Sequence, residues 1–111
     1  MSRFCTGESW VARPMSEAKF TEVRDPAFEA EWNCSMMGVS VPNLKQTRGT
    51  SDFHGSYNPR TETVNYTKPY LGLLLHELAH HICHVKGLNG RGNYHNVRFG
   101  EVLQELIDGN I

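Results

Sequence analysis

The segment from Leu71 to Val85 constrains the fold of this chain more than any other stretch of its 111 residues. Successive residues of a helix are turned by about 100°, and at that spacing the apolar residues of the segment fall within one sector of about 100°. They are Leu71, Leu74, Leu75, Leu78, Ile82 and Val85. His76, His80 and His84 fall on the opposite side. The pattern predicts a helix with one face in the core and a histidine-rich face turned away from it, ended by Gly87.

The residues His76–His80 read H-E-L-A-H, a match to the H-E-x-x-H pattern. On a helix, residues four apart lie one turn apart on the same face, so the imidazoles of His76 and His80 can bind one Zn²⁺. Glu77 lies beside that face, where its carboxylate can take a proton from a zinc-bound water. The pattern therefore predicts two zinc ligands and a general base at Glu77. The alternative is a solvated helix face that is merely rich in histidine, although ordinary polar faces carry Lys, Glu and Arg instead.

A catalytic zinc site usually has three protein ligands and one open position, so the motif alone is incomplete. His84 lies about 12 Å from His76 along the helix axis, which is too far for one ion to bridge. His81 points about 100° away from His80. Neither His84 nor His81 is therefore expected to complete the site.

His95 is the preferred third ligand. The glycine-rich stretch 87–93 can turn the chain back, so that His95 lies at the start of the last helix and its ring closes the site. A capping or surface role for His95 is the alternative, and Glu101 or Glu105 could take its place in a His-His-Glu site. Cys83 is interpreted as a small buried residue rather than a fourth ligand. If Cys83 did bind the metal, the site would be closed and structural, and the peptidase interpretation would fail.

A second helix is predicted at about 26–37, ahead of the motif. Asp25 can cap it, Pro26 suits its first turn and Gly38 can end it. Its large apolar residues lie four apart on one face and are Phe28, Trp32 and Met36. Trp32 is expected to pack in the core or against the N-terminal lead-in.

Short β-type runs follow and predict a small antiparallel sheet of three strands. They cover 39–41 together with 44–48, then 53–57, and finally 63–67. Residues 58–61 read as a turn, and Pro42 and Pro59 are confined to turns or edges. A last helix at about 96–107 carries its apolar residues on one face, namely Phe99, Val102, Leu103 and Leu106.

The chain is short enough for one α+β domain, expected at 16–111 behind an irregular lead-in at 1–15. Its net charge of −1 and the small excess of basic residues in 38–70 give no strong nucleic-acid signal. No apolar run reaches the length of a signal peptide or a membrane span. Three scattered cysteines without a C-x-x-C pair favour a reducing compartment, so a cytoplasmic location is expected.

The residues 74–81, which read L-L-H-E-L-A-H-H, are followed after a loop by H-N-x-x-F at 95–99. Together they resemble the SprT-like zinc metallopeptidase domain, in which a third histidine opens the helix after the H-E-x-x-H helix. Residues 41–42 and 55–59 also resemble the strands that precede the active-site helix of that family. The resemblance covers roughly residues 26–107, and its last third is the specific part.

The resemblance implies a minimal zincin-like fold with an N-terminal helix, a three-stranded sheet, the active-site helix and a C-terminal helix. It implies Zn²⁺ as cofactor, His76, His80 and His95 as ligands, and Glu77 as the catalytic residue. In such folds an edge strand often aligns the substrate backbone by strand addition, and 63–67 is the strand expected to do so.

The expected function is hydrolysis of peptide bonds in a protein or peptide substrate. The alternatives are a catalytically inactive, zinc-stabilised binding module of the same fold and a hydrolase for small amides. Glu77 favours an enzyme, because a purely structural site needs no base beside the metal. Tyr94 and Tyr57 are weak candidates for stabilising an oxyanion. Neither the oligomeric state nor the identity of the substrate follows from the sequence.

Overall fold

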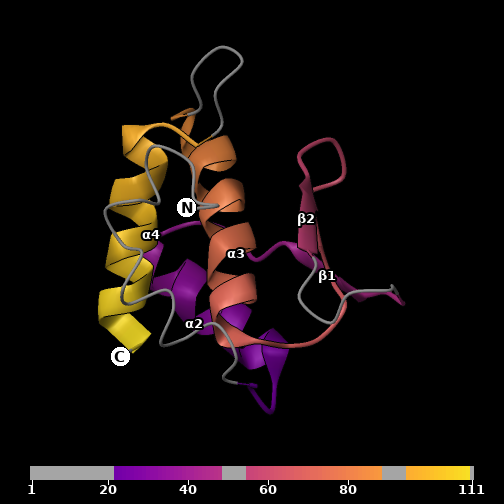
Figure 1. Ribbon diagram of the computed structural model, residues 1–111. Helices are drawn as coiled ribbons and strands as arrows, with labels where there is room; N and C mark the ends of the chain where they lie inside the picture. The colour runs from indigo at the N-terminus through magenta and orange to yellow at the C-terminus, as the bar shows by residue number, and fades with distance from the viewer. Residues whose placement is uncertain (1–21, 49–54, 89–94, 111) are drawn as a thin grey trace, which may run out of the picture.

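The computed structural model describes residues 22–48, 55–88 and 95–110. These residues form a small α+β fold with three helices and a three-stranded mixed sheet. In chain order the elements are α2 (Pro26–Met37), β1 (Asn43–Gln46), β2 (Gly55–Asn58), β3 (Thr63–Tyr66), α3 (Leu71–Lys86) and α4 (Val97–Asn110). Helix α3 lies at the centre, with α4 against one side of it and the strands on the other (Figure 1). The predicted lead-in 1–15 lies outside the described residues.

Helix α2 has the bounds and caps expected from the sequence. The Asp25 carboxylate accepts a hydrogen bond from the Phe28 N–H at 3.1 Å, Pro26 occupies the first turn, and Gly38 ends the helix with φ of +72°. Its packing differs from expectation. The helix buries its small side on α3, where Ala30 and Cys34 let the two backbones approach closely.

The large apolar residues of α2 face outward. Phe28, Trp32 and Met36 are 60%, 48% and 43% exposed. The prediction that Trp32 packs in the core is therefore wrong, and the alternative of packing against the lead-in 1–15 lies outside the described residues. Periodicity shows which residues share a face, but it does not show which face the neighbouring helix covers.

The sheet has the order β1-β3-β2, with β2 antiparallel and β1 parallel to β3. The prediction of an all-antiparallel sheet is therefore wrong. The short turn after β2 makes β2–β3 a hairpin, and β1 then pairs with the edge of β3 that the hairpin leaves free. The expectation that 63–67 forms an edge strand is also wrong, because β3 is central. The run 39–41 is not a strand, and pairing begins at Asn43.

Helix α3 is the common wall of two apolar clusters. One cluster joins α2, α3 and α4, and the other joins α3 to the sheet through Val64, Tyr66, Leu73 and Leu74. The predicted core residues of α4 are all buried. Val85, placed in the core stripe by periodicity, is 42% exposed, whereas Leu73 is buried against the sheet. Helix α3 therefore buries more than one face. Its histidine face lies between α4 and β2. Among the described residues, no helix combines the length and the apolar character needed to cross a membrane.

Candidate metal centre

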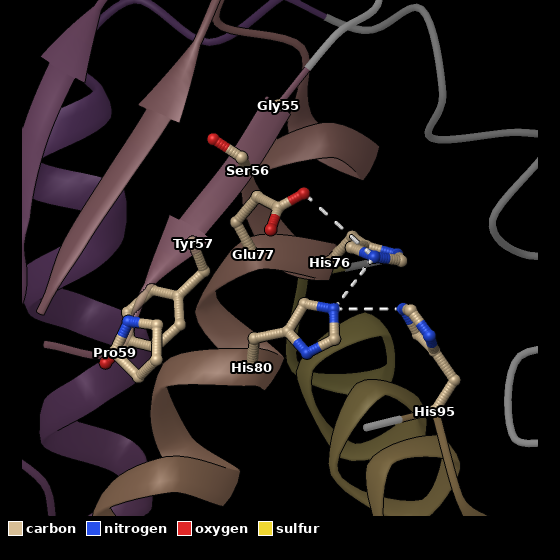
Figure 2. Close-up of a pocket in the computed structure, with 8 residues that line it drawn as sticks. All are labelled: Gly55, Ser56, Tyr57, Pro59, His76, Glu77, His80 and His95. Atoms are coloured by element: carbon tan, nitrogen blue, oxygen red, sulfur yellow. Dashed lines mark hydrogen bonds and ion pairs between the residues drawn. The ribbon is translucent and has the colours of Figure 1, made fainter. Parts of the chain in front are cut away.

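Three histidines converge beside α3. His76 and His80 lie one turn apart on that helix, and His95 lies two residues before the first residue of α4. The Nε2 atom of His80 lies 3.2 Å from Nε2 of His76 and 3.0 Å from Nε2 of His95. Figure 2 shows the three rings meeting at one point. One ligand atom from each lies within 4.8 Å of the others, so the three residues predicted as ligands could hold one metal ion.

The spacing of these nitrogens fits a tetrahedral metal ion. Two Zn–N bonds of 2.0–2.1 Å at the tetrahedral angle separate their nitrogens by about 3.3 Å. The distances of 3.2 and 3.0 Å are close to that value. Three protein nitrogens leave one tetrahedral position open, as in catalytic zinc sites. Imidazole also suits cobalt, nickel and copper, so the cluster defines the ligand chemistry but not the identity of the metal.

Burial favours the neutral, metal-binding form of His80. Burial lowers the pKa of His80 from 6.5 to about 3, and electrostatic repulsion from His76 and His95 contributes less to the same shift. A neutral imidazole retains the lone pair that a metal ion requires.

The position of His95 is explained by its neighbour Asn96. The Asn96 side-chain oxygen accepts from the Phe99 N–H at 3.0 Å and so caps α4. Its amide nitrogen donates to the Leu88 carbonyl at 3.2 Å, just beyond α3. These two bonds bring the start of α4 back to α3, and His95 lies beside His80 as a consequence. The expected glycine loop between them falls largely at 89–94, outside the described residues.

The apolar ring of Phe99 packs against all three histidines of the cluster. Its ring centroid lies 4.5 Å from that of His80, 5.0 Å from that of His95 and 5.2 Å from that of His76, and the side chain is fully buried. The sequence indicated Phe99 as a core residue of the last helix and as the last residue of the H-N-x-x-F motif. Its spacing of four residues from His95 was the signal that it also contacts the site.

Glu77 lies beside the cluster, as expected for a base. Its side chain is buried, and Oε2 lies 4.0 Å from His76 Nε2. The carboxylate and the three histidines share a cavity of about 470 Å³. The residues that line it are Gly55, Ser56, Tyr57, Pro59, His76, Glu77, His80 and His95 (Figure 2).

The opposite wall of this cavity is the edge of β2. Three consecutive residues, 55–57, line the cavity. Since successive side chains of a strand point to opposite faces, a cavity lined by all three runs along the edge of the strand. Strand β3 pairs with the other edge of β2. The strand nearest the histidines is therefore β2, and not 63–67 as expected.

His81 is a residue whose role the sequence analysis missed. Its side chain is fully buried, with Nδ1 2.8 Å from the Tyr57 hydroxyl and Nε2 2.8 Å from the Ser40 carbonyl oxygen. The geometric argument against His81 as a metal ligand agrees with this position. The signal for its actual role was a histidine on the apolar side of an amphipathic helix, where only a hydrogen-bonded side chain is tolerated.

The remaining candidates lie apart from the cluster. His84 pairs with Glu62 at 3.9 Å, and Glu101 pairs with Arg98 on the surface of α4. Glu105 is exposed. Cys83 is a buried core residue, and burial raises the pKa of its thiol to about 11. Tyr94 lies outside the described residues.

Comparison of the chain with protein-family models, with curated proteins and with solved structures found no match. The fold and the site therefore rest on the residues and their geometry.

Proposed function

We propose that this chain is a zinc-dependent metallopeptidase of the SprT-like, zincin type. The observation that carries the proposal is the combination at one cavity of three converging imidazoles, a buried carboxylate and a strand edge with which no other described strand pairs. A structural metal site needs the ligands alone, whereas hydrolysis also needs a base and a place for the substrate.

In this proposal His76, His80 and His95 hold the metal. A bound Zn²⁺ supplies Lewis acidity, which polarises a carbonyl and makes a water molecule acidic near neutral pH. Glu77 accepts the proton of the attacking water and returns it to the leaving amine. Its buried position beside the cluster supports this role, because little solvent reaches the carboxylate and can exchange a proton with it.

An extended peptide is the substrate class that the cavity favours. Among the described residues, no strand pairs with the edge of β2 that lies along the cavity containing Glu77. Such an edge offers backbone N–H and C=O groups to a chain of any sequence. A substrate added to β2 would therefore pass the base and the histidines. A small amide would not use this edge.

Tyr57 is less suited to stabilising an oxyanion than its position alone indicates. Its hydroxyl is engaged with His81 Nδ1. Burial and the nearby Glu62 carboxylate raise the pKa of Tyr57 to about 12, so the phenol stays protonated at neutral pH. Its one proton is used in the contact with His81 when the imidazole is neutral.

Metal content and hydrolysis of unfolded casein test the proposal. Wild type is expected to bind one Zn²⁺ per chain through nitrogen ligands and to cleave casein. Glu77→Gln is expected to keep the zinc and to lose at least about 10²-fold in kcat, because a positioned base contributes about 10²–10⁴-fold. Bound zinc without hydrolysis in wild type would favour the alternative, a zinc-stabilised binding module.

A further inference from the structure

Helix α3 carries two neighbouring rows of side chains, and His76, Glu77 and His80 from these rows line the cavity. His76 and His80 are one turn apart and meet His95. Leu73, Glu77 and His81 follow one another at intervals of four residues, so they form a second row along the helix. The members of this second row contact or face β2. Glu77, the proposed base, therefore lies in the same row as the residues that contact β2.

Strand β2 is held against this row at two points. At one point the backbone of Gly55 approaches Leu73 so closely that an added Cβ would lie 2.8 Å from Leu73 Cδ1. At the other point the hydroxyl of Tyr57 lies 2.8 Å from His81 Nδ1. Residue 77 lies midway between 73 and 81 along the helix. The edge of β2 consequently passes Glu77 between its two attachments.

The hydrogen-bond partners of His81 determine which of its ring nitrogens carries the proton. The Ser40 carbonyl oxygen can only accept, so Nε2 of His81 carries a proton and donates it. Nδ1 of the neutral imidazole then has only a lone pair, and the Tyr57 hydroxyl donates to it. Both ring nitrogens are thereby used, and the ring is fully buried. His81 thus joins three parts of the chain, namely α3, β2 and the segment that leads into β1.

We propose that His81 is a positioning residue. Through Tyr57 it holds the edge strand β2 at a fixed place beside Glu77 and the metal-binding histidines. The inference rests on the proposed function, because it assigns β2 to the alignment of an extended peptide. Adjacent residues of one rigid helix then serve two tasks. His80 contributes to the metal cluster, and His81 fixes the strand that presents the substrate to it.

Amide hydrogen exchange of Tyr57→Phe tests the mechanical part without any substrate. Removing the hydroxyl is expected to speed exchange of the protected β2 amides about tenfold relative to those of β1 and α3, because one buried hydrogen bond is lost. The matched control is Tyr66→Phe, which removes a hydroxyl from the central strand β3. Exchange in β2 that changes no more than exchange in β1 would overturn the proposal.

Casein hydrolysis by the zinc-loaded variant tests the functional part. Tyr57→Phe is expected to raise KM for casein about tenfold while kcat changes less than about threefold, because the strand aligns the chain less often but the base and ligands are intact. Zinc affinity is expected to stay within about twofold of wild type. A KM equal to that of Tyr66→Phe would overturn the role in substrate alignment.

A conservative pair of variants separates positioning from simple core packing. The side-chain oxygen of His81→Asn can reach the place of Nδ1 and accept from Tyr57, whereas His81→Leu fills the space without an acceptor. The Asn variant is expected to keep more protection of β2 and a lower KM than the Leu variant. Equal values in both would contradict the proposal. If wild type binds zinc but cleaves no casein, the proposed function fails, and the exchange experiment alone decides whether His81 positions β2.

Discussion

Single residues decide whether the histidine cluster is a metal site. The three imidazoles share one centre, yet a fourth histidine of the same helix face, His84, is engaged with Glu62 instead. His84 and the three clustered histidines therefore differ in their neighbours: His84 lies beside a carboxylate, whereas the other three lie beside one another. This difference provides a matched pair for mutagenesis.

His95→Ala is expected to weaken zinc binding by more than the roughly 10- to 100-fold that loss of an outer-shell partner costs, because it removes a direct ligand. His84→Ala is the control and is expected to leave the zinc affinity unchanged. Competition with a chromophoric chelator measures both. An affinity of His95→Ala equal to that of His84→Ala would remove His95 from the ligand set.

The helix ends decide how the elements are placed. Gly38 ends α2 and Gly87 ends α3, with φ of +72° and +68°, and a Cβ at either position would meet no other atom within 4 Å. Substitution at these two sites therefore probes backbone conformation alone. Both caps were readable in the sequence, because glycine is the residue that adopts this conformation without strain.

Gly38→Ala and Gly87→Ala are each expected to destabilise the fold by about 1–2 kcal/mol, because an L-residue is strained in the left-handed region. Gly109→Ala in α4 is the control, since its methyl group would meet only the flexible end of Met36. Urea denaturation measures the three values. A loss in Gly109→Ala as large as in the two cap variants would contradict the conformational explanation.

Over the whole molecule, binding of a metal ion by the three histidines would be coupled to folding. His76 and His80 lie on α3 and His95 lies just before α4, so the three rings converge only when these parts of the chain are packed together. A metal ion that binds the folded chain alone stabilises it by mass action.

Zinc at about 100 times its Kd is expected to raise the free energy of unfolding by about 2.7 kcal/mol. For a chain of this size that corresponds to a rise in Tm of about 10–20 °C. Differential scanning calorimetry with zinc, and again after addition of EDTA, measures the effect. Magnesium is the control, because it prefers oxygen ligands. An equal rise with magnesium would argue against the histidine site.

Alkaline pH is expected to destabilise the fold through two buried thiols. Burial raises the pKa of Cys34 and of Cys83 from 9.0 to about 11, and Lys86 only partly opposes this at Cys83. Between pH 9 and 11 the folded state consequently binds more protons than the unfolded state, so stability falls as pH rises through this window. Urea denaturation at pH 8 and pH 10 measures it. The Cys34→Ala/Cys83→Ala variant is expected to lose less stability over the same interval, and an equal loss would exclude the thiols as the cause.

What the sequence by itself determined is local. The helix at 26–37 with its caps at Asp25 and Gly38, the motif helix ended by Gly87, and the buried face of the last helix all follow from spacing and from residues with particular backbone preferences. The spacing of His76, Glu77 and His80 likewise follows from helical geometry alone. The proposed chemistry was already contained in these residues.

Only the tertiary structure decided what these local elements meet. Periodicity does not encode strand direction, so the parallel pairing of β1 with β3 and the edge position of β2 could not be read from it. Trp32 faces outward because α2 packs its other side, with Ala30 and Cys34, against α3. His95 reaches His80, and His81 reaches Tyr57, through contacts between residues distant in sequence. Such contacts depend on how whole elements pack, and no local pattern specifies that.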